Sequence, residues 1–333
     1  IFLFLCLGVT EAAGTRPATR KPGAHAFEPE LLRFEESFDA MGTTYSVVLY
    51  GSDRYKLAAA AEAAFEEVRR LDHLLSNYRP DSEWSEVNKN AANRPVRISQ
   101  ELFELLAFCV DVSRRSEGAF DISVGPLMKV WGFYKGSGHL PHRAEVRGAL
   151  TRVGWTNIAL DRVNRTVSFR RFGVELDPGG VGKGYAVDRM VAILKENGIT
   201  SAMITAGGSS IYGLGAPPEE PRGWRVSLRH PRETRRTIQE AFLLNGSMST
   251  SGNYEKFFRA EGRIYSHIMD PRTGFPAQGM LSASVLAART LDSEVWTKPF
   301  FIHGRNWAAR HKPQGFRVFL CEDRSELACA WVQ

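Results

Sequence analysis

The sequence has few cysteines, no long apolar run and no dense block of charge of one sign. Its four cysteines among 333 residues form no CxxC pair and have no metal-type spacing, so neither a zinc site nor a disulfide scaffold is supported. Cys321 and Cys329 could pair in an oxidising compartment, but we favour roles as small core residues. Lysine and arginine exceed aspartate and glutamate by only 43 − 37 = 6, and nothing in their distribution points to nucleic acid as a partner.

The first residues are the one compositional anomaly. Ile1–Val9 is continuously apolar, the first charge is Glu11, and small residues follow at 12–14. The run is too short to span a membrane, which takes roughly 20 apolar residues, but it matches the apolar core of a secretory signal. We expect residues 1–14 to be a truncated signal peptide for export, with a buried strand as the alternative. Cys6 leaves lipid attachment open, although the bulky residues before it disfavour that.

The rest of the chain predicts a linker followed by one mixed domain. Residues 15–31 are rich in Pro, Arg, Lys and Ala without periodicity and predict a flexible linker, so the folded domain covers 32–333. Apolar spacings of three and four predict helices at 55–75, 100–113, 144–150, 185–197 and 292–304. Apolar runs predict strands at 45–50, 201–205, 224–228, 237–244, 263–268, 282–287 and 316–321, with a hairpin at 157–169. This irregular order favours an α+β fold with antiparallel-rich sheets over a doubly wound parallel sheet.

The richest stretch for chemistry is residues 175–188, ELDPGGVGKGYAVD, where four glycines and a lysine stand between a strand and a helix. Backbone amides at such a helix start can approach phosphate oxygens closely. The stretch is neither a Walker A loop nor a GxGxxG fingerprint, and a plain turn that caps a helix is the alternative. A second glycine-rich turn at 206–210 follows the next strand. Two such loops favour a ligand that carries phosphate.

Hydroxyl groups and a histidine gather further along the chain. Residues 247–254 read SMSTSGNY, and residues 266–276 read SHIMDPRTGFP. The serines lack the GxSxG elbow, so a serine hydrolase is unsupported. A lone histidine such as His267 at the end of a strand is more often structural than catalytic, and it gains weight only in combination with other segments.

Five segments together resemble the ApbE family, the FAD:protein FMN transferases. They are FDAMGTTY at 38–45, SNYRPDSEWSEVN at 76–88, GAFDISVGPL at 118–127, the glycine-rich stretch, and SMSTSGNY with SHIMDPRTG. They occur in the family's order and cover the chain from about residue 34 to about residue 303. The resemblance implies a single ApbE-like domain that binds FAD, cleaves its diphosphate with help from Mg²⁺, and transfers FMN to a threonine hydroxyl of a partner protein.

The resemblance also implies which residues bind FAD. They are Met41, Tyr78, Ala119, Phe120, Asp121, Gly179, Lys183, Tyr185, His267 and Ile268. Met41 and Tyr78 would pack on the flavin or adenine rings, Asp121 would accept a hydrogen bond from the nucleotide, and Lys183 would place a point charge on the diphosphate. The alternatives are that Tyr78 and Phe120 are core residues, that Asp121 is a cap and that Lys183 is a solvated surface residue.

His267 is the candidate base that activates the acceptor hydroxyl, because a neutral imidazole can take a proton near neutral pH. A serine or threonine hydroxyl is a poor nucleophile until a base or a metal assists it. Asp270 would orient His267 or serve the Pro-Arg-Thr-Gly turn that it opens. These two residues are the catalytic candidates.

The metal site is where the sequence departs from the family. Members supply a carbonyl from the glycine loop, here best matched by Gly182, and an Asp and a Thr four residues apart, here aligned with Glu294 and Lys298. Asp292 or Thr297 would substitute as a ligand if the register slips. Lys298 cannot bind a metal while protonated, so we hypothesise that its ammonium partly replaces the cation and weakens or alters the Mg²⁺ dependence. An ion pair on a solvated helix face is the alternative.

The predicted function is thus FMN transfer from FAD to a threonine of an acceptor flavoprotein, such as a membrane-bound redox subunit. The apolar start of the chain predicts that the protein acts after export, in the periplasm or at the outer face of the inner membrane, with a lipid anchor at Cys6 as an open alternative. Two alternatives stay open. One is an FAD pyrophosphatase that yields FMN and AMP, and the other is a periplasmic flavin-binding protein without turnover.

Overall fold

The computed structural model describes residues 31–136, 138–233 and 235–333. The predicted signal peptide, Cys6 and all of the linker but its last residue lie outside these residues. The first described strand, β1, begins at Leu32, where the sequence predicts that the folded domain starts. In the part of the chain that the structure describes, no helix combines the length and the apolar character that a membrane crossing requires.

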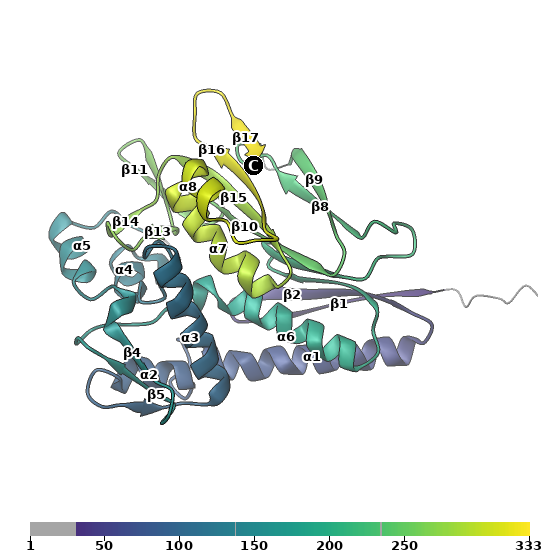
Figure 1. Cartoon of the computed structure of the whole chain (residues 1–333), viewed down its shortest axis with the longest axis horizontal. Helices are drawn as coiled ribbons and strands as arrows, with labels where there is room; N and C mark the ends of the chain where they lie inside the picture. The colour runs from purple at the N-terminus through teal and green to yellow at the C-terminus, as the bar shows by residue number, and fades with distance from the viewer. Residues whose placement is uncertain (1–30, 137, 234) are drawn as a thin grey trace, which may run out of the picture. The chain divides into compact units, whose positions relative to one another are not determined.

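The centre of the fold is an eight-stranded sheet in which every neighbouring pair is antiparallel (Figure 1). This pairing confirms the α+β prediction and excludes a doubly wound sheet. In sheet order the strands are β1 (Leu32–Ala40), β2 (Thr43–Gly51), β6 (Ser201–Ala206), β7 (Ser210–Leu214), β10 (Gly246–Gly252), β15 (Met280–Ala287), β16 (Arg317–Glu322) and β17 (Ala328–Trp331).

Three helices cover one face of this sheet and a hairpin covers the other. The helices are α1 (Arg54–Leu75), α6 (Gly182–Glu196) and α7 (Thr290–His303), which lie side by side and share the main core with alternate residues of β2. The hairpin is β8 (Trp224–Arg229) and β9 (Thr237–Leu243), and it packs on Val48 and other residues of the opposite face. Side chains alternate across a strand, so β2 contributes to both cores. The short helix α8 (Arg305–His311) follows α7.

The segment between β2 and β6 builds most of a second group of elements. Its helices are α2 (Glu83–Asn90), α3 (Gln100–Arg115), α4 (Gly125–Val130) and α5 (Arg143–Leu150), and its small sheet has the order β3 (Val96–Arg97), β5 (Thr166–Phe169) and β4 (Ile158–Asp161). Two short ribbons, β11 (Phe257–Ala260) with β12 (Arg263–Ser266) and β13 (Met269–Asp270) with β14 (Phe275–Pro276), come from the later part of the chain. Aromatic residues of this later part pack on Trp131 beside α4.

Cys321 and Cys329 correct one expectation from the sequence. They face each other across β16 and β17 and form a disulfide, with Cα atoms 4.1 Å apart. The sequence favours separate small core residues, because a spacing of eight does not show that a tight hairpin places the two side chains in register. Cys109 on α3 is a buried free cysteine.

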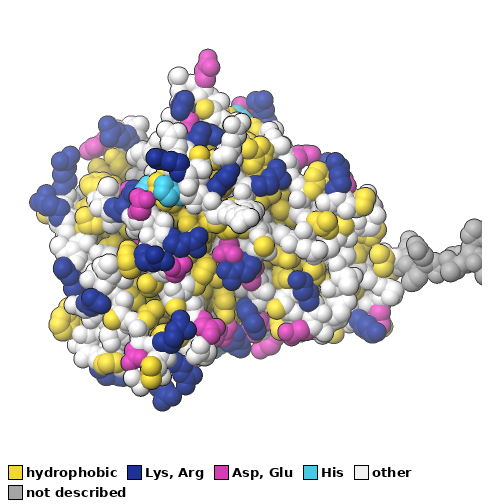
Figure 2. Space-filling model, in the orientation of Figure 1, with side chains coloured by type: hydrophobic (Ala, Val, Ile, Leu, Met, Phe, Trp, Pro, Cys, Tyr) yellow, Lys and Arg dark blue, Asp and Glu magenta, His cyan; other side chains and the backbone are white. Residues whose placement is uncertain are grey.

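The surface carries mixed charge on the face seen in Figure 2. Lysine and arginine side chains are interspersed there with aspartate and glutamate, and apolar atoms lie between them. The described surface also contains close ion pairs, for example Arg70 with Glu67 at 2.8 Å and with Glu101 at 2.7 Å.

Candidate functional site

The glycine-rich stretch forms a single 3₁₀ turn, η3 (Pro178–Gly180), followed by the first turn of α6. The buried carboxylate of Asp177 accepts the backbone N–H of Gly179 at 2.6 Å, which caps the turn. The helix begins at Gly182, three residues before the predicted start. The N-terminal N–H groups of an α-helix lack intrahelical acceptors and attract anions, so this is the part of the fold that suits a diphosphate.

Met41 reaches the glycine loop from the turn between β1 and β2. Met41 and Gly42 both have positive φ, at 50° and 69°, as a two-residue hairpin turn of the I′ type requires. The hydroxyl of Tyr45 donates to the Met41 sulfur at 3.3 Å. A Cβ atom on Gly182 would lie 3.0 Å from the Met41 methyl group, so the thioether packs against the start of α6.

Phe120 also borders the glycine loop, while Asp121 points into the protein. A Cβ atom on Gly180 would lie 3.5 Å from the Phe120 ring. The Asp121 carboxylate accepts hydrogen bonds from the N–H and hydroxyl of Ser123 and from the N–H of Trp155, at 2.6 to 2.8 Å. Burial raises its pKa to about 6. These contacts match the alternative role of Asp121 as a cap. Ala119, close to it in the sequence, is buried.

Two lysines and a buried glutamate meet at the start of α6, and we call them the Lys183–Glu294–Lys298 cluster. Glu294 on α7 is 2% exposed, and its Oε2 accepts the N–H of Gly184. Its Oε1 lies 3.6 Å from the Lys183 Nζ and has no hydrogen-bond partner among the described residues. Lys298 donates from Nζ to the carbonyl of Gly180 at 3.2 Å and to that of Glu294 at 2.8 Å. The cluster therefore joins α7 to the glycine loop.

Lys298 keeps its charge near neutral pH in this position. Burial lowers the pKa of Lys298 to about 8, and the carboxylate of Glu294 opposes that shift. At pH 7 the ammonium form still predominates. The alternative of an ion pair on a solvated helix face does not describe this contact, because Lys298 reaches inward to two backbone carbonyls.

The other predicted metal ligands point elsewhere. Asp292 forms an ion pair with Arg289 at 2.7 Å. Thr297 is buried, donates to the carbonyl of Glu294 and shares a hydrogen bond of 2.7 Å with Ser251 on β10. Gly182 lies within the first turn of α6, where a carbonyl accepts the N–H four residues later. Asp292 and Thr297 thus have other partners in the structure, and the carbonyl of the glycine loop that accepts from Lys298 is that of Gly180.

This donor set does not fit Mg²⁺. Magnesium prefers six oxygen ligands in near-octahedral geometry. The cluster offers one carboxylate, whose Oε1 pairs with the Lys183 ammonium at 3.6 Å, and two backbone carbonyls that already accept from the Lys298 ammonium. Within residues 31–136, 138–233 and 235–333, no three His, Cys, Asp or Glu side chains gather as a metal site.

His267 is held as a neutral base beside the lysines. Its Nδ1 lies 3.1 Å from the carbonyl oxygen of Lys256. A carbonyl has no hydrogen to give, so Nδ1 donates in this bond and Nε2 keeps its lone pair. Burial, together with the positive charges of Lys183, Lys256 and Lys298, lowers the pKa of His267 to about 4.

Asp270 takes no part in holding His267. Its carboxylate forms a two-point ion pair with Arg272, with both distances 2.9 Å, and its carbonyl accepts the N–H of Gly274 in the turn. The orienting role expected of Asp270 belongs instead to the Lys256 carbonyl. Ile268 next to the histidine is buried in the main core.

The two predicted tyrosines differ in their surroundings. Tyr78 is 74% exposed and lies edge-on to Tyr134, with ring centroids 6.3 Å apart. The hydroxyl of Tyr185 donates a hydrogen bond to Glu101 on α3 at 2.7 Å. Glu101 in turn pairs with Arg70 on α1.

Tyr134 and Lys256 are residues of the site that the sequence motifs do not predict. The Tyr134 hydroxyl is buried without a hydrogen-bond partner, and burial together with the charge of Asp177 raises its pKa. The dense aromatic segment between Gly132 and Gly136 was the available signal for Tyr134. No local pattern marks Lys256, because its contribution is a backbone carbonyl.

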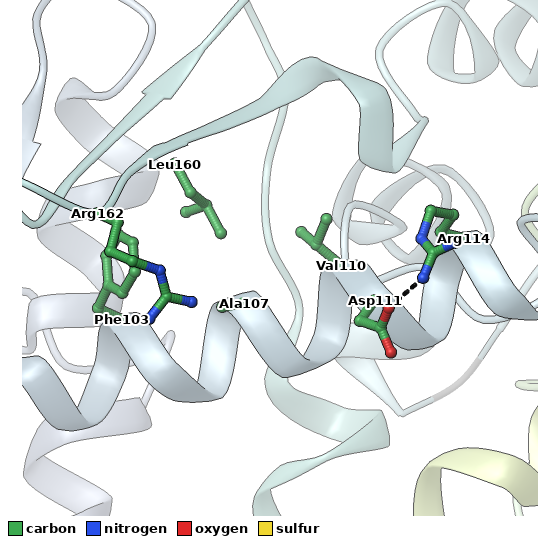
Figure 3. A pocket seen from close by; sticks show the side chains of 7 residues that line it. All are labelled: Phe103, Ala107, Val110, Asp111, Arg114, Leu160 and Arg162. Carbon is green, nitrogen blue, oxygen red and sulfur yellow. Dashed lines mark hydrogen bonds and ion pairs between the residues drawn. The ribbon is translucent and has the colours of Figure 1, made fainter.

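A surface groove on α3 and β4 shares no residue with this site (Figure 3). An ion pair between Asp111 and Arg114 borders it. Its lining residues are Phe103, Ala107, Val110, Asp111, Arg114, Leu160 and Arg162.

The sequence is similar to those of known proteins of one family. The chain matches the ApbE family over residues 41–319. An FAD:protein FMN transferase of Klebsiella pneumoniae is 32% identical over 78% of this chain and 79% of its own length. One of Salmonella typhimurium is 27% identical over 99% of this chain and 92% of its own length.

Two solved structures share the fold. The ApbE protein of Thermotoga maritima has a TM-score of 0.81 at 27% identity and covers 89% of this chain and 96% of its own. The flavinyl transferase ApbE of Pseudomonas stutzeri, in its apo form, has a TM-score of 0.80 at 25% identity and covers 91% and 95%. Because the family match spans most of the chain and the fold agrees over nearly its whole length, the chain belongs to the ApbE family, as its five sequence segments predict.

Proposed function

We propose that this protein is an FAD:protein FMN transferase that attaches FMN to a threonine side chain of an acceptor flavoprotein. The observation that carries the proposal is a neutral His267 among three lysine charges beside the glycine-rich start of α6. Such a site combines a base with groups that neutralise a diphosphate. The activity named for the relative that is 32% identical supports the same reaction.

The reaction needs one displacement at phosphorus. The threonine hydroxyl oxygen attacks the phosphorus of the FMN half of FAD, and a new P–O bond to threonine forms. The P–O bond between the two phosphates breaks, and AMP leaves with its electron pair. Nε2 of His267 accepts the hydroxyl proton. Lys183 offsets the negative charge that grows on the diphosphate oxygens.

The ring systems of FAD would use the apolar residues around the loop. Met41 and Phe120 flank the glycines, and a thioether and an aromatic face both bind planar rings well. Tyr78 offers an exposed ring for a second stacking contact, with Tyr134 behind it. The same two tyrosines lie near the charge of Asp177 beside the loop.

We further propose that the protein works outside the cytoplasm, on an acceptor such as a membrane-bound redox subunit. The disulfide between Cys321 and Cys329 supports this location, because disulfides persist in oxidising compartments and are rare in the cytosol. The apolar start of the chain supports export as well.

The test is an incubation of the purified protein with FAD and a candidate acceptor, followed by mass spectrometry of the acceptor and chromatography of the nucleotides. We expect an acceptor that is heavier by one FMN and the release of one AMP per transfer. An acceptor with its threonine changed to alanine, and the variant His267→Ala, are the controls, and both should give no product.

The other outcomes separate the alternatives. Free FMN and AMP with an unmodified acceptor would indicate an FAD pyrophosphatase. Bound FAD that stays intact would indicate a flavin-binding protein. Either outcome, repeated with several acceptors and with Mg²⁺ added, contradicts the proposed transfer.

A further inference from the structure

Lys298 on α7 reaches the glycine loop that precedes α6. Its Nζ is held by the carbonyl of Gly180, in the glycine loop, and by the carbonyl of Glu294, one turn earlier on α7. An ammonium group has three N–H donors, and these two bonds use two of them. In the described part of the chain the third donor has no acceptor, which leaves it available for a ligand oxygen.

The rest of the cluster is arranged around this ammonium. Glu294 is anchored through Oε2 to the N–H of Gly184, and its Oε1 lies 3.6 Å from the Lys183 Nζ. The carboxylate thus holds a second ammonium beside the first. Together the side chains of Lys183, Glu294 and Lys298 carry a net single positive charge, which an anionic ligand would compensate.

We propose that the ammonium of Lys298 replaces a divalent cation in this protein, and that it binds the FAD diphosphate together with Lys183 without Mg²⁺. The inference rests on the proposed function, because it takes FAD as the ligand. An ammonium contributes charge and hydrogen bonds but no ligand for a metal. A Mg²⁺ ion at Glu294 would also be repelled by both lysines at close range.

The variant Lys298→Thr tests the idea most directly. It removes the ammonium, frees the Gly180 carbonyl and places a hydroxyl oxygen one helical turn after the Glu294 carboxylate. The Gly180 carbonyl, the Glu294 carboxylate and the new hydroxyl would then offer three oxygen atoms of the kinds that Mg²⁺ prefers. Lys298→Met removes the ammonium without adding an oxygen. Lys195→Thr, at an exposed lysine near the end of α6, is the matched control.

The measurements are FAD affinity from flavin fluorescence, in EDTA and in Mg²⁺, and Mn²⁺ binding without FAD from electron paramagnetic resonance. The wild type and Lys195→Thr should bind FAD equally in both buffers and bind no Mn²⁺. Lys298→Thr should bind FAD about 10- to 100-fold more weakly in EDTA, the range for one lost charged hydrogen bond, recover in Mg²⁺ and bind Mn²⁺. Lys298→Met should stay weak in both buffers.

The wild type alone can overturn the inference, even if the variants do not fold. FAD binding that requires Mg²⁺, or tight binding of Mn²⁺ by the wild type, would show that the site takes a divalent cation after all. An unchanged FAD affinity in folded Lys298→Met would show that the ammonium does not bind the diphosphate. Failure to bind FAD in either buffer contradicts the proposed function itself, so the two failures are distinguishable.

Discussion

The carboxylate of Asp188 on α6 accepts the backbone N–H of Thr290, the first residue of α7, at 2.6 Å. Its second oxygen accepts the N–H of Leu291 at 2.9 Å. Arg289, which precedes α7, provides no side-chain cap, so the neighbouring helix supplies one. This contact fixes where α7 begins relative to α6, and α7 carries Glu294 and Lys298 to the glycine loop.

The variant Asp188→Ala should therefore lose both stability and FAD affinity. It leaves two buried N–H groups without an acceptor, and we expect the free energy of unfolding to fall by about 1–3 kcal/mol. Urea unfolding measures this loss. Asp161→Ala is the matched control, since Asp161 also accepts two backbone N–H groups but in an exposed turn. Equal losses in the two variants would contradict a special role for the α6–α7 contact.

The pH dependence of transfer should reflect the unusual state of His267. A histidine with the ordinary pKa of about 6.5 would lose its base form below that pH. The pKa of His267 is lowered to about 4, so the neutral base persists to lower pH. We expect kcat/KM to stay level from about pH 7 to about pH 5 and to fall tenfold per pH unit below about 4. Above about pH 8 it should fall as well, as Lys298 loses its charge.

Lys256 offers a check on the cause of that shift. Its charge is one of those that lower the pKa of His267, and Lys256→Gln removes the charge while it keeps the carbonyl that holds Nδ1. The acid limb of the rate profile should move to higher pH in this variant and stay in place in Lys195→Gln. A wild-type limb centred near pH 6.5 would show that His267 is not the base or that its pKa is not lowered.

The same shift has a consequence for stability with a definite sign. The pKa of His267 is lower in the folded protein than in the unfolded chain, so the folded form holds the neutral ring when the unfolded form is protonated. Its contribution to stability is therefore complete above about pH 6.5 and is lost as the pH falls towards about 4.

Local patterns in the sequence predict the amphipathic helices well and the polar or edge strands poorly. The predicted ranges for α1 and α3 end within two residues of the observed ones, because the apolar residues of each helix face one core. β10 escapes prediction because most of its residues are small and polar, and Met248 is its one large apolar side chain. Ser249 and Ser251 hydrogen-bond to Ser293 and Thr297 on α7, and only the folded structure pairs these hydroxyls. β1 is also not predicted, because it is a largely exposed edge strand without a clear alternation of apolar and polar residues.

The same distinction applies to the site. Residues within sequence motifs could be predicted, whereas residues that act through tertiary contacts could not. Motif resemblance predicted Met41, Phe120 and Lys183, whose surroundings at the glycine loop the structure now describes. Lys256 could not be predicted, because it acts through a backbone carbonyl that tertiary packing brings to His267. Asp270 follows His267 closely in the sequence, yet the turn directs its carboxylate to Arg272.

A last prediction concerns Gly184, where α7 lies close to the backbone of α6. A Cβ atom at this position would lie 2.6 Å from the carbonyl oxygen of Thr290 and 2.8 Å from the Oε2 of Glu294. Backbone cannot move aside as a flexible side chain can, so Gly184→Ala must push the two helices apart. We expect a loss of about 1–3 kcal/mol in the free energy of unfolding, measured by urea unfolding.

Gly148 on α5 is the matched control for that substitution. It also lies inside a helix, and a Cβ atom added there meets nothing within 4 Å. Alanine is favoured over glycine in a helix by up to about 1 kcal/mol, so Gly148→Ala should stabilise the protein slightly. Gly184→Ala gains the same helix propensity, and its net loss would therefore isolate the cost of the contact with α7. Because that contact holds the N–H of Gly184 against Glu294, the variant should also weaken FAD binding, whereas Gly148→Ala should not. A Gly184→Ala protein as stable as Gly148→Ala would contradict the close approach of the two helices on which the Lys183–Glu294–Lys298 cluster depends.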